Sequence, residues 1–138
     1  MTAVDTNVLV YSLDATEPVK QPKATALLQQ LTSGRTQPIL LWQVLAETVR
    51  QLRTWHANGR MRWDEVLGHL AHIRSMFLLV MPTPNVLDIA LDLSSRYSLS
   101  HWDSMILGAC KDAGITTLYT EDIGAPTSYD GIQLINPF

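Results

Sequence analysis

Short apolar runs alternate with segments of helical periodicity along the whole of this chain. The apolar runs end near Val4 and then cover residues 39–41, 77–81, 115–119 and 132–135. Strands that are separated by helices favour a parallel sheet with helices on both faces. The pattern therefore predicts an α/β fold, and in such sheets ligands bind beyond the carboxyl ends of the strands.

Helices are expected between these strands, with proline near a helix start and glycine beyond its end, as at Pro22 and Gly34. The expected helices cover approximately residues 6–12, 22–31, 42–56, 63–76, 84–97 and 100–113. The Thr83-Pro84 pair is expected to start the fifth of them. The apolar face of the third helix is expected to consist of Trp42, Leu45, Val49 and Leu52. That of the fourth helix is expected to consist of Val66, Leu67, Leu70 and Ile73.

The composition is that of an ordinary globular protein, with 138 residues, 46% hydrophobic and 17% charged, and predicts a single domain over residues 1–138. The longest apolar run, Met76–Met81, is too short to span a bilayer. No signal peptide is expected, so the chain is interpreted as cytoplasmic and free of membrane. The single Cys110 excludes an internal disulfide and a cysteine zinc site, and its spacing predicts a place in the core.

Four carboxylates stand in surroundings that are otherwise apolar: Asp5, Glu47, Asp103 and Asp122. Burying an unpaired carboxylate costs several kcal/mol, so such a group is expected to have a cation beside it or a shifted pKa. If the fold brings the four together, their natural partner is a hard divalent metal ion. The net charge of −3 includes these four carboxylates. Without them the chain has 13 − 4 = 9 acidic and 10 basic side chains, so the rest is nearly neutral. Net charge therefore neither supports nor excludes an RNA substrate.

Asp5 and Asp122 each follow an apolar strand, at the edge where ligands bind. A turn-forming role within Asp5-Thr6-Asn7 is the alternative for Asp5, and Thr6 and Asn7 are candidates for further contacts in the same site. Asp122 is the preferred ligand of its loop, although a plain loop aspartate fits too. Glu121 is equally acidic and is interpreted as an outer neighbour of the site.

Glu47 and Asp103 have stronger structural alternatives. Glu47 lies opposite the apolar face of its helix together with Gln43 and Thr54, as a solvated glutamate would. Asp103 stands three residues after Ser100, in the spacing of a capping box. One carboxylate oxygen of Asp103 can cap the helix while the other binds a metal ion.

Four arginines gather near tryptophans around the Asn58-Gly59 break and form a candidate surface for RNA or a protein partner: Arg50, Arg53, Arg60 and Arg62. A solvated helical hairpin is the alternative. His69 and His72 are interpreted as surface histidines, since no acid lies suitably near them for a metal site.

The chain resembles PIN-domain ribonucleases and, more narrowly, the VapC-type toxins of bacterial toxin–antitoxin pairs. The segments that carry the resemblance, in chain order, are Val4–Leu9, Leu45–Glu47, Trp102–Ala109, Leu118–Asp122 and Asp130–Phe138. It implies a three-layer sandwich with a central, mainly parallel five-stranded sheet, and an endoribonuclease that uses one or two Mg²⁺ or Mn²⁺ ions. It also implies RNA products with a 5′-phosphate and a 3′-hydroxyl, a homodimer, and an antitoxin protein as partner. The family's acids fall on Asp5, Glu47, Asp103 and Asp122, its early amide on Asn7, and its hydroxyl before the last acid on Thr120.

Two departures from the family pattern stand out. Leu41-Trp42 offers no hydroxyl cap to the helix that carries Glu47, and residues 123–126 lack the polar or basic residues that relatives often have. Neither departure removes a metal ligand.

Other classes of protein fit less well. A phosphoacceptor receiver domain needs a pair of acids after the first strand and a late lysine, whereas Asp5 stands alone and no lysine follows Lys111. A haloacid-dehalogenase phosphatase needs Asp-x-Asp where this chain has Asp5-Thr6-Asn7. A catalytically weak PIN-like module that only binds RNA or protein is the remaining alternative.

Overall fold

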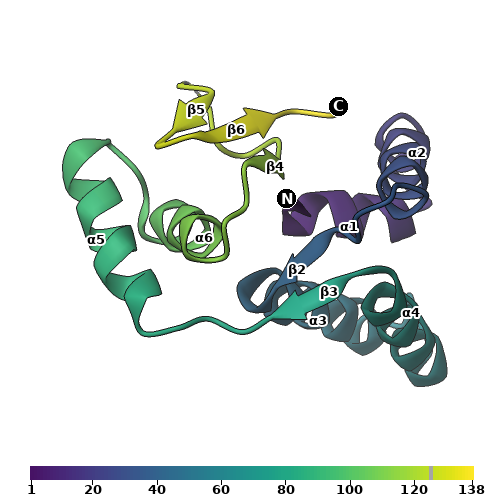
Figure 1. Ribbon diagram of the computed structural model, residues 1–138. Helices are drawn as coiled ribbons and strands as arrows, with labels where there is room; N and C mark the ends of the chain where they lie inside the picture. The colour runs from purple at the N-terminus through teal and green to yellow at the C-terminus, as the bar shows by residue number, and fades with distance from the viewer. Residues whose placement is uncertain (125) are drawn as a thin grey trace.

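The computed structural model describes residues 1–124 and 126–138 and shows helices packed on both faces of one central sheet (Figure 1). The strand order is β3-β2-β1-β4-β6-β5, and all neighbouring strands are parallel except β5 and β6. The α/β three-layer prediction is confirmed, but the sheet has six strands instead of five. The strands are β1 (Thr2–Val4), β2 (Ile39–Leu41), β3 (Leu78–Val80), β4 (Thr117–Tyr119), β5 (Ser128–Tyr129) and β6 (Ile132–Ile135).

The sixth strand, β5, belongs to a tight hairpin that the sequence prediction missed. Its two turn residues, Asp130 and Gly131, have φ angles of 49° and 88°, and β5 and β6 pair on either side of them. Two consecutive positive φ angles define a type I′ turn, for which Asp-Gly is a preferred sequence. The Asp-Gly pair was therefore the available signal. Asp130 is also held by Arg96 and Lys111, which fix the hairpin to the neighbouring helices.

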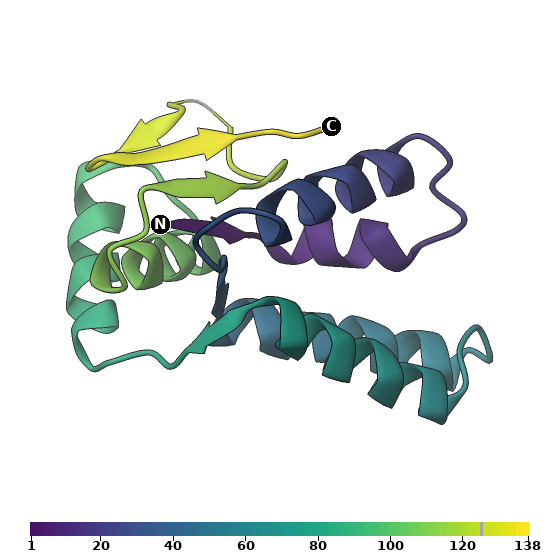
Figure 2. The same cartoon turned by 45° about the vertical axis from the view of Figure 1, so that its right-hand side comes forward.

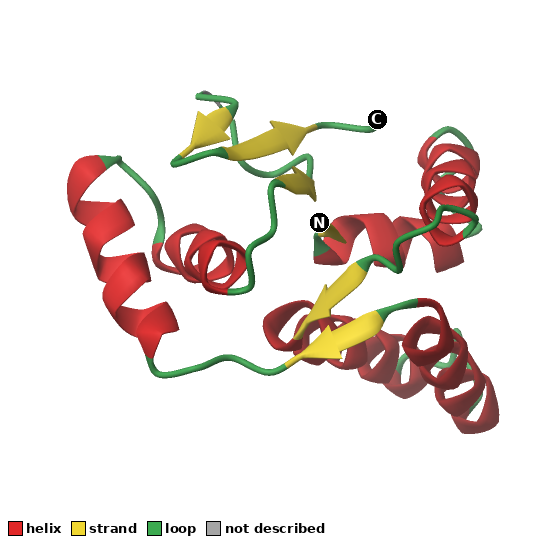
Figure 3. Ribbon diagram, in the orientation of Figure 1, coloured by secondary structure: helices red, strands yellow, loops and turns green. Residues whose placement is uncertain are grey.

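Six helices cover the sheet, and every predicted helix and strand end lies within two residues of the observed one. The first four helices lie to the right of and below the strands in Figure 1, and the last two lie on the left, on the other face. The 45° rotation of Figure 2 and the colouring of Figure 3 show the same division. The helices are α1 (Thr6–Leu13), α2 (Lys20–Thr32), α3 (Trp42–Ala57), α4 (Trp63–Met76), α5 (Asn85–Arg96) and α6 (His101–Asp112).

The core forms where these layers meet. Ala3 and Val4 of β1 and Leu118 of β4 are completely buried, as is Cys110, so the predicted place of the cysteine in the core is confirmed. Two residues assigned to apolar helix faces are exposed instead: Trp42 by 45% and Leu67 by 52%. Trp42 is the first residue of α3 and directly follows Leu41, the last residue of β2. No helix in the described ranges is both long and apolar enough to cross a membrane.

Helices α5 and α6 approach each other closely at Gly108. A Cβ atom at this position would lie 2.9 Å from the carbonyl oxygen of Val86 and 3.2 Å from the Cβ of Ala90. Real side chains do not tolerate such contacts, so the small residue sets the distance between the two helices. This packing fixes the direction of α6, the helix that begins with His101, Trp102 and Asp103.

Candidate active site

The site is built at the point where the strand order reverses. β1 and β4 are neighbours in the sheet although most of the chain separates them, and both run in the same direction. Their carboxyl ends are joined by a hydrogen bond from the Asp5 backbone N–H to the Tyr119 carbonyl (2.8 Å). Ligands of open α/β sheets bind in the crevice at such a switch point.

Asp5 links β1 to α1 and is buried, with 8% of its surface exposed. Its carboxylate accepts a hydrogen bond from the Thr6 backbone N–H (2.7 Å), which caps α1, and another from the Thr120 hydroxyl (2.7 Å). Burial raises the pKa of Asp5 to about 6, in spite of these two hydrogen bonds, and the negative charges of Asp122 and Glu47 add to the rise. Asp5 is thus a desolvated carboxylate that is repelled by the charges of two other predicted acids, Asp122 and Glu47.

The two residues after Asp5 hold those two acids. The Thr6 hydroxyl donates a hydrogen bond to Glu47 of α3 (2.7 Å), and the Asn7 amide donates one to Asp122 (2.9 Å). Glu47 accepts a second hydrogen bond, from Gln43 one turn earlier in α3 (3.0 Å). The triplet Asp5-Thr6-Asn7 therefore connects the start of α1 with α3 and with the loop after β4. It does more than form a turn.

Asp103 lies at the start of α6. Its backbone N–H donates a hydrogen bond to the Ser100 hydroxyl (3.2 Å), which is one half of the predicted capping box. The reciprocal bond, from the Ser100 backbone N–H to the Asp103 carboxylate, is not formed, and this carboxylate accepts no hydrogen bond from the described part of the chain. Ser100 thus caps the helix without the carboxylate, which leaves both oxygens of Asp103 free for a ligand.

All four predicted acids line one cleft of about 770 Å³. Asp5 and Asp122 come from the strand ends, Glu47 from α3 and Asp103 from α6. The side chains as they stand do not form a group of three or more carboxylates, histidines or cysteines placed to hold a metal ion, within residues 1–124 and 126–138. Three of the acids are instead engaged by Thr6, Asn7 and Thr120, so metal ligation stays a prediction.

The chemistry of the residues nevertheless fits a hard divalent ion. The cleft offers carboxylate oxygens, the donors that Mg²⁺ and Mn²⁺ prefer. The side-chain oxygen Oδ1 of Asn7 is buried and has no hydrogen-bond partner, although the amide nitrogen of the same residue binds Asp122. A buried acceptor without a partner is costly, and a cation or its bound water would satisfy it.

Glu121 does not line the cleft, unlike its neighbour Asp122. It accepts hydrogen bonds from the Tyr11 hydroxyl (2.5 Å) and from Lys20 (2.8 Å), and Lys20 lies 4.5 Å from the centre of the Tyr11 ring. These contacts keep the pKa of Glu121 below its usual range and fasten the loop that carries Asp122 to α1 and α2. The sequence carries no local signal for the roles of Lys20 and Tyr11, because both lie about a hundred residues away from Glu121 in the chain.

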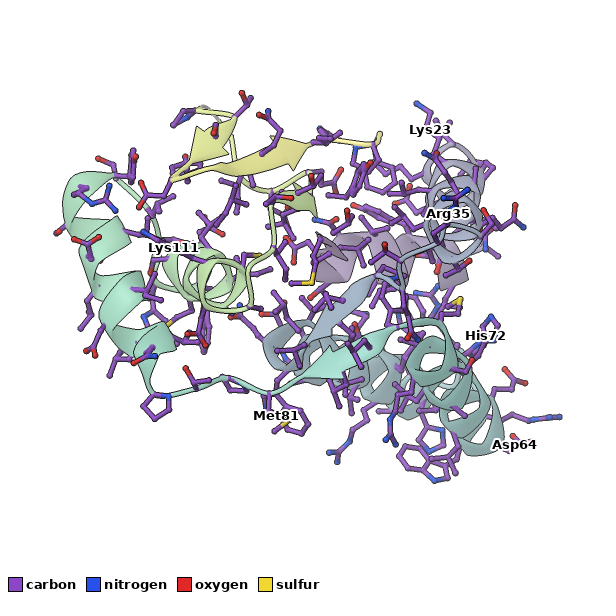
Figure 4. All side chains as sticks on the ribbon, in the orientation of Figure 1. Lys23, Arg35, Asp64, His72, Met81 and Lys111 are labelled. Carbon is purple, nitrogen blue, oxygen red and sulfur yellow. The ribbon has the colours of Figure 1, made fainter. Side chains whose placement is uncertain are left out.

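The four arginines divide into two groups. Arg50 lines the cleft, and Arg53 lines a smaller hollow beside it on α3. Arg60 pairs with Asp14 (3.0 Å), and Arg62 pairs with Asp64 (2.9 Å). Asp64 lies at the end of α4 that is remote from the sheet (Figure 4). Arg50 is the arginine placed to act together with the acids.

The two departures from the family pattern lie at the start of α3 and in residues 123–126. Helix α3 begins after Leu41 with no side-chain hydrogen bond at its cap, as the missing hydroxyl implied. Ala125, in the segment that departs from the family pattern, lies outside the described residues.

The fold and the cleft define an α/β protein of the doubly wound type with an acidic crevice at its switch point. The chain belongs to the PIN domain family, because the family model for the PIN domain matches residues 2–126. The predicted family is therefore confirmed. A comparison with curated protein sequences gives no match.

Several solved structures have the same fold. A toxin–antitoxin complex from Klebsiella pneumoniae has a TM-score of 0.71 and 17% identity, over 100% of this chain and 98% of that one. The VapBC2 complex from Rickettsia felis, bound to a DNA fragment from its promoter, has a TM-score of 0.72 and 16% identity, over 98% of this chain and 97% of that one. VapC20 from Mycobacterium tuberculosis, a Sarcin-Ricin loop cleaving toxin, has a TM-score of 0.65 and 20% identity, over 88% of this chain and 90% of that one. The resemblance to VapC-type proteins is thus confirmed at the level of the fold.

Proposed function

We propose that this protein is a metal-dependent endoribonuclease, and that it is the toxin of a toxin–antitoxin pair. One observation carries the proposal: acids from four separate segments line one cleft, and the most buried of them, Asp5, is desolvated close to two others. Bringing these negative charges together in a partly desolvated cleft is costly, and a bound divalent cation would compensate them.

In this proposal Asp5 and Asp103 are the principal ligands of one or two Mg²⁺ or Mn²⁺ ions. Glu47 and Asp122 either bind the ion directly or hold the water around it. When bound, the ion would polarise the scissile phosphate and lower the pKa of the attacking water. The chain's own contribution is orientation, because Thr120 holds Asp5 and the hydroxyl of Thr6 holds Glu47.

The substrate and the partners are proposed by analogy with the proteins of similar fold. One of these is described as cleaving the Sarcin-Ricin loop, and two are toxin–antitoxin structures. We therefore propose RNA as substrate, an antitoxin protein as partner, a homodimer, and a place in the cytoplasm. Arg50 in the wall of the cleft is positioned to meet an RNA phosphate.

Cleavage of a labelled single-stranded RNA, with the protein purified free of host nucleases, tests the enzymatic part. Activity is expected with Mg²⁺ or Mn²⁺ and is expected to disappear with EDTA and with Asp5→Asn. Asp130→Asn is the matched control, since it makes the same chemical change in a turn outside the cleft and should leave cleavage intact. Cleavage that persists in Asp5→Asn would refute the role of Asp5. RNA that is bound but never cut would favour the PIN-like binding module instead.

The toxin part has its own test. Expression of the wild-type chain in bacteria is expected to arrest growth, and Asp5→Asn is expected to relieve the arrest. Normal growth in the presence of soluble wild-type protein would contradict a toxin and would leave a nuclease of another purpose.

A further inference from the structure

Two exposed tryptophans stand at the mouth of the acidic cleft. Trp42 begins α3 and is 45% exposed, and Trp102 is the second residue of α6 and is 63% exposed. Both line the same cleft as the carboxylates. Large exposed aromatic side chains at a cleft are unusual on a folded protein and indicate a surface that is covered by something else.

The two tryptophans are held close to the acids. The Gln43 amide donates a hydrogen bond to the Trp102 carbonyl oxygen (3.4 Å), which bridges the first turns of α3 and α6. Gln43 also binds Glu47, and Trp102 directly precedes Asp103. Trp102 is therefore on the same helical turn as Asp103, and Trp42 lies five residues before Glu47 in α3.

Beyond the tryptophans the lining of the cleft is mainly apolar, although it also includes Asp112, which accepts a hydrogen bond from the Thr83 hydroxyl (2.6 Å). Its wall continues over Val80, Met81 and Pro82 at the end of β3, and over Met105 and Ile106 of α6. Met81 lies on the outside of the molecule beside β3 (Figure 4), and 57% of its surface is exposed. The cleft thus has an acidic part, around the ends of β1 and β4, and next to it a mainly apolar, partly aromatic part.

We infer that this apolar part is a subsite for an unstacked nucleobase of the RNA, next to the phosphodiester that the carboxylates address. The inference rests on the proposed nuclease function and specifies its substrate as RNA with an unpaired base at the cleaved position. Unpaired bases splay out and stack on aromatic side chains, which is how single strands are distinguished from duplexes.

A nucleotide explains the combination of features better than a protein segment does. A nucleotide presents a flat apolar base and an anionic phosphate within one small unit, and the cleft places tryptophan rings beside a site for cation-bound phosphate. Arg50 is the one cation among the lining residues that the structure describes, and it can meet a neighbouring phosphate. Gln51 also lines the cleft, and its amide makes no hydrogen bond within the described part of the chain, so it is free to bind a base edge.

The test compares alanine variants of three tryptophans on matched RNAs. Trp42→Ala and Trp102→Ala remove the proposed stacking rings, and Trp63→Ala is the control, because Trp63 is 46% exposed on α4 beside His56 and does not line the cleft. The substrates are one short single-stranded RNA and a series in which each nucleotide near the cleaved bond in turn lacks its base. The readouts are kcat/KM with Mg²⁺ and RNA affinity in EDTA.

The expected result is a coupling between ring and base. Trp102→Ala should reduce both readouts about ten- to a hundredfold on intact RNA, and the reduction should vanish for the RNA that lacks the base at one position. Trp102→Phe should retain most of the wild-type values, since it keeps a ring, and Trp63→Ala should match wild type. Circular dichroism of each variant confirms that it is folded.

Three results would overturn the inference. Losses that are equal on intact and base-less RNA would show that the rings do not contact a base. Unchanged cleavage and binding, together with lost self-association or lost binding of a protein partner, would assign this face to a protein. RNA that is neither bound nor cut would overturn the subsite and the proposed function together. Coupling in affinity without cleavage would leave the subsite standing and refute only the nuclease.

Discussion

Replacing the most buried carboxylate of the site by its neutral isostere should make the metal-free protein more stable at neutral pH. In the folded chain burial raises the pKa of Asp5 to about 6, from 3.8 for an exposed aspartate. One pKa unit corresponds to about 1.4 kcal/mol, so this difference lowers the free energy of unfolding at neutral pH by roughly 3 kcal/mol. Asp5→Asn removes that cost because asparagine carries no charge.

The sign of the pH dependence follows from the raised pKa. Well below pH 3.8 the carboxyl group of Asp5 is protonated in both the folded and the unfolded state, and its raised pKa does not change the free energy of unfolding. Between pH 3.8 and about 6 the unfolded chain loses the proton first, so the wild-type protein loses stability as the pH rises. Above pH 6 the full cost is present. The gain from Asp5→Asn should therefore grow from under about 1 kcal/mol at pH 4 to between 1 and about 3 kcal/mol at pH 7.5.

The lower end of that range allows for the hydrogen bonds. Asparagine can still accept from the Thr6 backbone N–H, and its amide can donate to the Thr120 hydroxyl, which also accepts from the Asp122 backbone N–H (3.2 Å). The Thr120 hydroxyl then loses its own acceptor, which costs part of the gain, on the order of 1 kcal/mol.

Urea unfolding in EDTA at pH 4 and pH 7.5 measures these differences. Asp130→Asn is the control of opposite sign, because Arg96 and Lys111 hold the pKa of Asp130 well below its usual range, so its charge stabilises the fold at neutral pH. Added Mg²⁺ should stabilise the wild-type protein and not Asp5→Asn, since an ion that binds only the folded state adds to stability. An Asp5→Asn protein that is less stable than wild type by the same amount at both pH values would refute the desolvated carboxylate.

Three other substitutions have defined outcomes. Thr120→Val keeps the side-chain shape but removes a hydrogen bond that lowers the pKa of Asp5, so a pH titration followed by NMR should place that pKa above the wild-type value. Gly108→Ala puts a methyl carbon 2.9 Å from the backbone of α5, and urea unfolding should show a loss of about 1–3 kcal/mol. Lys20→Met frees Glu121 and loosens the adjacent loop, so a Mn²⁺ titration should show weaker binding while Lys20→Arg restores it.

The regular elements were predictable because their signals are local. Apolar runs marked every strand except β5, and the helix ends were marked by Pro22, Gly34, Thr83 and the Asn58-Gly59 break, so each predicted end fell within two residues of the observed one. The hairpin of β5 was missed because β5 is two residues long and its alternation is too short to recognise. Burial of single residues was less predictable. Trp42 has the right spacing for a core position, yet it stands past the end of the sheet.

The acids of the site were predictable for a different reason: a carboxylate inside an apolar segment is conspicuous in the sequence itself. The residue that pairs with each acid was not predictable, although Thr6, Asn7 and Thr120 were expected in the site. Asp5 is held by Thr120 and Asp122 by Asn7, in each case from 115 residues away in the chain. Strand order decides which loops meet, and the sequence of a single chain does not reveal that β1 lies beside β4. The division of the arginines, with Arg60 and Arg62 engaged in ion pairs, depends on the same long-range information.

Contacts across 115 residues also determine when the chain gains its chemistry. Closing so long a loop costs entropy that only the finished sheet recovers, so we expect the cleft to form late in folding and to be lost early in unfolding. A nascent chain on the ribosome that has not yet released its fourth strand carries Asp5, Glu47 and Asp103 but no Asp122. If the chain is a nuclease, the translation machinery that makes it is protected from it until the polypeptide has almost fully emerged.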